Sequence, residues 1–106
     1  MRLELDHFFI LTKPGAPEAN LLTNIGLIEG SANDHLGQGT SNRRFFFADS
    51  MLELLYIRDT QEAKKETGCR LHLVERAANE TASPFGLVLR AADESAFTSF
   101  LVWKYH

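Results

Sequence analysis

The chain has no excess of basic residues: its 106 residues include 11 Lys and Arg against 14 Asp and Glu, a formal net charge of -3 at pH 7. Such a balance does not neutralise phosphates, so we expect neither nucleic acid nor an anionic membrane as a partner. Long apolar runs are also missing. Residues 3–6 alternate apolar and acidic types, unlike a signal peptide, and no later stretch is long enough to span a bilayer. These absences favour a cytoplasmic protein.

Cysteine is nearly absent as well. Cys69 is the only one, which excludes an internal disulfide and fits a reducing compartment. No His or Asp motif frames this thiol, so we expect no nucleophile there. Hydrophobic residues make up 44% of the chain, which at this length is enough for one globular domain with a modest core.

Alternation of residue types predicts a first strand over residues 3–11, with a second half apolar on both faces. Pro17 and Glu18 suit the first turn of a helix, and Gly26 suits its end. The other elements expected in this half are a strand starting at 27–29, a stretch that is mostly loop at 30–42, and a hairpin of strands at 43–48 and 51–57 around a turn at 49–50. The predicted order is therefore β-α-β-β-β.

The second half begins with Asp59 and Glu62, which have the spacing of a capping box and predict the start of a helix. Residues 71–74 fit either a helical connector, which we favour, or a short strand. An apolar run at 85–89 predicts another strand, and a final helix is expected from residue 93.

His7 and Glu53 are polar residues inside otherwise apolar strands. A buried neutral imidazole needs a partner for each nitrogen, so His7 is either a ligand or a core residue satisfied by its neighbours. A buried carboxylate needs a cation or hydrogen-bond donors, or it takes up a proton. The residues leave two interpretations of Glu53: a ligand or catalytic base, or an ion pair with Arg43 or Arg44.

Arg43 and Arg44 are adjacent in a predicted strand, so they point to opposite faces and only one can face a cavity. An inward arginine could hold a substrate carboxylate as a bidentate pair. The alternative is one arginine in solvent and one paired with Glu53 or Glu29.

Residues 37–40 (GQGT) lack the spacing of a phosphate-binding loop, and no predicted helix follows them. We expect a turn whose glycines adopt positive φ. His35, just before this turn, could lie over the mouth of a pocket, whereas His72 and His106 are expected in surface or packing roles.

A β-α-β-β-β unit with LDHFFI at residues 5–10 and LELL at 52–55 resembles the vicinal-oxygen-chelate superfamily, the glyoxalase, bleomycin-resistance and extradiol-dioxygenase group. Residues 39–42 (GTSN) are similar to a Gly-Thr-x-Asn segment that precedes a strand in its glyoxalase-like members. The resemblance covers residues 3–57, and beyond them it rests mainly on PFGLVLR at 84–90.

This resemblance implies a single α+β, glyoxalase-like domain over residues 1–106. Its parts would be a βαβββ unit at 1–58, a helical connector at 59–83 and a partial second unit at 84–106. In the superfamily two such units form a cupped sheet. A His from a first strand and a Glu from a fourth strand hold a divalent metal.

By the same resemblance His7 and Glu53 are metal ligands for Fe, Mn, Ni, Co or Zn, and Glu53 could also act as the catalytic base. The substrate is then a small molecule that binds through two neighbouring oxygens. The residues expected beside it are Arg44, His35, Phe46 and Tyr56.

The second half departs from the pattern, because Phe85 stands where a second His is expected and the chain ends before a second Glu. Two protein ligands are too few for a well-held metal. Three alternatives follow: a partner copy donates its own His7 and Glu53, the chain is a fragment of a two-unit protein, or no metal binds. We expect a homodimer or a truncated chain.

Three functions are open at this point. The first is a metal-dependent enzyme of the lyase, isomerase or dioxygenase type. The second is a bleomycin-resistance-like protein that binds a small molecule without turnover, in a cavity lined by Phe8, Phe46 and Tyr56. In the third, Glu53 is paired with an arginine and the domain serves only assembly.

Overall fold

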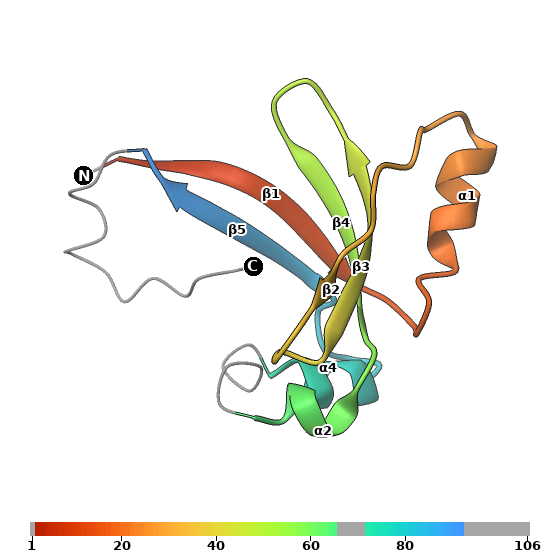
Figure 1. Cartoon of the computed structure of the whole chain (residues 1–106), viewed down its shortest axis with the longest axis vertical. Coiled ribbons are helices and arrows are strands. Elements are labelled where there is room, and N and C mark those ends of the chain that lie inside the picture. Colours follow the sequence, from red (N-terminus) through yellow and green to blue (C-terminus); the bar gives the residue numbers. More distant parts are fainter. Residues whose placement is uncertain (1, 66–71, 93–106) are drawn as a thin grey trace.

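The computed structural model describes residues 2–65 and 72–92, which form an α+β fold built on one curled, mixed sheet with a few short helices (Figure 1). The elements, in chain order, are β1 (Leu3–Leu11), α1 (Glu18–Asn24), β2 (Asp34–His35), β3 (Thr40–Phe46), β4 (Met51–Ile57), α2 (Thr60–Ala63), α4 (Leu73–Ala78) and β5 (Phe85–Ala91). The strands lie in the order β2-β3-β4-β1-β5.

β1 connects the hairpin of β3 and β4 to β5. It pairs in parallel with β4, where Phe9 lies beside Glu53, and antiparallel with β5, where Phe9 lies beside Gly86. β3 pairs antiparallel with β4, and Arg44 lies beside Glu53. A parallel pair needs a crossover connection, and the chain between β1 and β4, which includes α1, provides it.

The two faces of the sheet carry separate hydrophobic clusters. α1 covers one of them, which we call the outer face (Figure 1). The buried residues of the outer cluster are Ala16, Ala19, Phe45 and Leu54. The opposite face, the inner face, packs against α4 near the end of β4. The buried residues of the inner cluster are Phe9, Leu11, Leu55 and Leu73.

Most elements of the first half match the sequence prediction. β1 and β4 have the predicted bounds, and α1 starts after Pro17. Beyond the end of α1, Gly26 has a φ of 105°, a conformation that glycine adopts without strain. The predicted hairpin turn is present, with Phe47 N donating to Ser50 O at 2.9 Å.

The strand predicted to start at 27–29 is wrong. Only Glu29 pairs in this segment, in an isolated bridge with Phe45. Leu27 remains hydrogen-bonded to α1, since its N–H donates to Leu22 O at 3.1 Å. The segment just past the helix therefore meets β3 through this bridge and through Gly30 N, which donates to Arg44 O at 2.8 Å, and forms no strand of its own.

The second strand is instead β2, within the stretch predicted as loop, and β3 starts at Thr40 rather than at residue 43. Gly37 and Gly39 have φ of 81° and 73°, as predicted for the turn. This tight turn lets Asp34 and His35 pair back onto the start of β3. The sequence pattern did not predict this pairing, because the two residues of β2 are both polar.

Asp59 begins α2 as predicted, since its carboxylate accepts a hydrogen bond from Glu62 N at 3.1 Å. The Glu62 carboxylate does not complete a capping box and accepts from Gly39 N at 3.0 Å instead. α4 confirms the helical interpretation from Leu73 onward, and β5 extends the predicted strand to Ala91.

The final helix predicted from residue 93 lies outside the described residues, as does Cys69. In the described part of the chain no helix combines the length and apolar character needed to cross a membrane.

Candidate functional site

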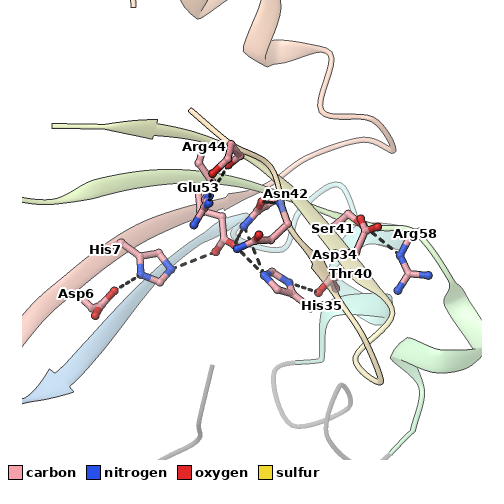
Figure 2. Close-up of polar contacts among 12 residues, drawn as sticks. Asp6, His7, Asp34, His35, Thr40, Ser41, Asn42, Arg44, Glu53 and Arg58 are labelled. Atoms are coloured by element: carbon pink, nitrogen blue, oxygen red, sulfur yellow. Dashed lines mark hydrogen bonds and ion pairs between the residues drawn. The ribbon is translucent and has the colours of Figure 1, made fainter. Parts of the chain in front are cut away.

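His7 and Glu53 face each other on neighbouring strands of the inner face (Figure 2). His7 Nε2 lies 3.2 Å from Glu53 Oε1, and the two residues are only 3% and 0% exposed. Their positions follow from the register of β1 and β4, which sets Phe9 beside Glu53 and so leaves His7 one side-chain repeat away on the same face. The two polar residues that the sequence singled out therefore lie together.

Asp6 contacts the other nitrogen of the His7 ring, with Oδ1 2.6 Å from Nδ1. Adjacent residues of a regular strand point to opposite faces, but the register of β1 against β5 shifts between Leu5 and His7, and such a bulge re-aims side chains. Burial lowers the pKa of His7, but hydrogen bonds and charges from Glu53 and Asp6 outweigh it and raise the pKa above 6.5. The two carboxylates thus favour positive charge at this ring.

The second carboxylate oxygen of Glu53 faces β3 and β2. Asn42 Nδ2 donates to Oε2, and the Asn42 amide is itself held because its Oδ1 accepts from Asn33 N at 2.8 Å. His35 Nε2 lies 3.5 Å from the same Oε2. The carboxylate is therefore held on one side by His7 and on the other by Asn42, whose Nδ2 also lies 3.5 Å from His35 Nε2 and donates toward it.

His35 is 3% exposed, with Nδ1 2.8 Å from Thr40 Oγ1. Burial lowers its pKa, and the positive charge of Arg44 adds to this, although Glu53 opposes it. The sequence placed His35 over the mouth of a pocket, whereas the pairing of β2 with β3 carries the ring into the buried cluster.

Three members of the cluster were missed by the sequence reasoning: Asp6, Thr40 and Asn42. The sequence did carry a signal for Asn42, which is the Asn of the Gly-Thr-x-Asn segment. In the structure Asn42 is buried, at 2% exposure. Asp6 had none, since alternation places it on the face opposite His7 in a strand without a bulge.

Arg43 and Arg44 point to opposite faces, as predicted. Arg43 makes a bidentate pair with Glu29, with Nη2 2.7 Å from Oε1 and Nε 2.8 Å from Oε2. Arg44 lies on the inner face, where Nε and Nη2 donate to Ser31 O and Oγ, each at 2.7 Å. The carboxylate partner of Arg43 is thus Glu29, one of the two acidic residues that the sequence had left open.

The aromatic candidates do not gather at the cluster. Phe46 is on the inner face and stacks under Arg44, whose guanidinium carbon lies 5.0 Å from the ring centre, but it is 54% exposed. Tyr56 packs against the outer cluster. Phe8 lines an apolar groove of about 330 Å³ together with Phe85 and Leu87. Phe8 and Tyr56 alternate with the inward residues of their strands, so neither shares a cavity with His7.

His7 Nε2 and Glu53 Oε1 are spaced as two ligands of one ion would be. Donors about 2.1 Å from a common ion and about 90–110° apart lie roughly 3.0–3.4 Å from each other, and the observed separation is 3.2 Å. A carboxylate on the second ring nitrogen, here Asp6, is common at metal-ligating histidines. Residues 2–65 and 72–92 contain no group of three His, Cys, Asp or Glu able to hold a metal ion, and the closely spaced pair of donors here has two members.

No family model matches the chain, and no curated protein matches it. Its fold is similar to the crystal structure of a hypothetical protein from Staphylococcus aureus, with a TM-score of 0.67 and 18% sequence identity. The match covers 93% of this chain but 41% of that chain, so this chain spans less than half the length of its structural neighbour. At this identity the likeness concerns the fold alone.

Proposed function

We propose that the chain forms half of a divalent-metal site of the vicinal-oxygen-chelate type, in a glyoxalase-like protein acting on a small molecule with two neighbouring oxygens. The observation that carries this proposal is the buried pair of His7 Nε2 and Glu53 Oε1, 3.2 Å apart on adjacent strands. The parallel pairing of β1 and β4 within a β-α-β-β-β order supports it, since it brings a first-strand His to a fourth-strand Glu. The reaction class is a lyase, an isomerase or a dioxygenase.

In this site His7 and Glu53 hold the ion, and Asp6 fixes the orientation of the His7 ring through Nδ1. A divalent ion bound there supplies Lewis acidity to the two substrate oxygens. The Glu53 carboxylate can also serve as a general base for a proton on a substrate atom next to the ion. Arg44 is the candidate to bind a substrate carboxylate, because it lies on the same face and Ser31 steadies its guanidinium.

Two protein ligands do not hold an ion well, so the site needs more donors. We assign them to a second copy of the chain, whose own His7 and Glu53 meet the first pair across a two-fold axis. Such a homodimer holds one ion for every two chains. A second unit on a longer polypeptide would instead give one ion per chain.

Elemental analysis of the purified protein, together with its mass in solution, tests the proposal. We expect one Fe, Mn, Ni, Co or Zn ion per dimer. His7→Ala and Glu53→Gln should each abolish uptake of the ion because each removes a ligand. His72→Ala is the matched control, since it removes an exposed histidine.

The decisive comparison is between the protein as purified and the metal-free protein after dialysis against each of the five ions. Protein that takes up none of them, while its unfolding transition shows that it is folded, refutes the metal site. Uptake that survives His7→Ala and Glu53→Gln refutes the assignment of these ligands.

A second candidate function is the binding of an apolar small molecule without turnover. The groove beside Phe8 favours it, because it is lined by apolar side chains and Phe8, Phe85 and Leu87 are 44%, 65% and 63% exposed. Thermal stabilisation by a planar apolar ligand in EDTA, lost in Phe8→Ala but kept in Glu53→Gln, would support it. Stabilisation that requires the metal would favour the enzyme.

A further inference from the structure

Asn42 lies on the inner face of β3, and both ends of its side-chain amide are hydrogen-bonded. Oδ1 accepts from Asn33 N at 2.8 Å, and Nδ2 donates to Glu53 Oε2 (Figure 2). The backbone adds a second link to Asn33, because Asn42 N donates to Asn33 O at 3.0 Å. Asn42 is only 2% exposed, so bulk water does not compete for either end of the amide.

These neighbours select one orientation of the Asn42 amide. The N–H of Asn33 needs an acceptor, which Oδ1 provides, so Nδ2 faces the carboxylate of Glu53. Nδ2 also lies 3.5 Å from His35 Nε2, which can accept its second hydrogen. A reversed amide would place its oxygen against the carboxylate oxygen. The amino group therefore belongs on the side of Glu53.

The contact with Asn42 gives the two oxygens of Glu53 different surroundings. Oε2 accepts the hydrogen bond from Asn42, whereas Oε1 lies 3.2 Å from His7 Nε2. To bind an ion beside His7 through both oxygens, the carboxylate would have to turn Oε2 away from Asn42. Glu53 is 0% exposed, so bulk water would not replace the lost bond, and a buried donor left unpaired is costly.

The chemical type of this donor also suits a cation site. An arginine hydrogen-bonded to the carboxylate would repel a divalent ion, because both carry positive charge. The amide of Asn42 donates a hydrogen bond but carries no net charge. Asn42 can thus orient the carboxylate and leave its negative charge to the ion.

We infer that Asn42 is a positioning residue, whose amide holds Oε2 of Glu53 so that Glu53 binds the ion through Oε1 alone. This rests on the proposed metal site. Hydrogen-bond partners of metal ligands are worth about 10–100-fold in metal affinity. Asn42 therefore acts on the ion through Glu53 and is not itself a ligand.

Calorimetric titration of the full chain, with Ni²⁺ alone as the probe, tests the inference. Asn42→Leu keeps the approximate size of the side chain and removes the donor, so we expect about 10–100-fold weaker binding. Ser41→Ala is the matched control. Ser41 is 1% exposed on the same strand, points to the face opposite Asn42, and donates a hydrogen bond to Asp34 Oδ1. The control should lose stability but keep the wild-type affinity.

Two outcomes of the titration contradict the inference. One is a folded Asn42→Leu variant with wild-type affinity. The other is equal weakening in Asn42→Leu and Ser41→Ala, because the effect would then follow from any lost hydrogen bond in β3.

Infrared spectra report whether Glu53 binds through one oxygen or two, which a merely structural role of Asn42 would not change. The difference between Ni²⁺-loaded and metal-free protein should show the wide separation of carboxylate stretching bands that is typical of one-oxygen binding. Asn42→Leu should narrow this separation. A narrow separation in the wild type overturns the inference, and this measurement decides the matter if Asn42→Leu does not fold.

Side-chain ¹⁵N–¹H NMR of the metal-free protein separates this inference from the proposed function. The Nδ2 hydrogen that Asn42 donates to Glu53 should resonate downfield in the wild type, and Glu53→Gln should shift it upfield, because a neutral acceptor is weaker. An Asn42 amide that does not respond to Glu53→Gln overturns the inference whatever the metal result. A wild type that binds no ion but shows this response refutes the proposed function and supports the hold of Asn42 on Glu53.

Discussion

Gly39→Ala should destabilise the fold more than any other single methyl group added to the turn beside the candidate site. Gly39 has a φ of 73°, and a Cβ built on it would lie 2.3 Å from Ala63 N and 2.4 Å from Asp59 O. Both are backbone atoms, so the strain cannot be relieved by rotation of a side chain. The start of α2 or the turn itself has to move.

The expected loss of folding stability in Gly39→Ala has two parts. An alanine in the left-handed region costs roughly 1–2 kcal/mol. Gly39 N donates to Glu62 Oε1 at 3.0 Å, and Gly39 O accepts from Arg58 N and Asp59 N at 2.8 and 3.0 Å. Displacement of the turn weakens these bonds, at about 1 kcal/mol each. We therefore expect a loss of about 3 kcal/mol or more, which would lower Tm by about 12 °C or more.

Gly37→Ala is the matched control. Gly37 has a φ of 81°, but a Cβ there meets nothing within 4 Å, so only the backbone cost of about 1–2 kcal/mol applies. Urea unfolding followed by circular dichroism gives both free energies. If Gly39→Ala is no more destabilising than Gly37→Ala, the close packing of this turn against α2 is refuted.

Two further predictions concern elements that support the sheet. The hydrogen bond from Arg43 lowers the pKa of Glu29 below 4.5, so the pair stabilises the fold above this pH and the benefit is lost as the pH falls through the lowered value. Glu29→Gln should thus cost up to about 1 kcal/mol at pH 7, and its urea midpoint should converge with that of the wild type in acid; a constant difference would contradict the pair. Asp59→Ala removes the acceptor for Glu62 N and should cost about 1 kcal/mol in thermal unfolding, whereas Asp59→Asn should cost much less; equal losses would argue against the cap.

Local signals explain how much of the fold could be predicted. Residue alternation predicts the strands β1 and β4, Pro17 and Gly26 mark the start and end of α1, and Asp59 caps α2. All of these signals act within a few residues. β2 could not be found in this way, because Asp34 and His35 are polar and their pairing depends on a turn whose glycines permit positive φ. The segment around Glu29 looked like a strand for the opposite reason, since it contains apolar residues, of which Leu27 packs against the outer cluster and Ile28 is 87% exposed, and it pairs with β3 only in an isolated bridge at Glu29.

The candidate site, too, could be predicted from the sequence only in part. His7 and Glu53 stand out by sequence alone, because a polar side chain inside an apolar strand has to be satisfied where it is buried. That Glu53 meets His7, Asn42 and His35 rather than an arginine was decided by tertiary structure, through the parallel register of β1 and β4 and the pairing of β2 with β3. Sequence periodicity determines which face a side chain takes, but only the order and register of strands determine its neighbours on that face.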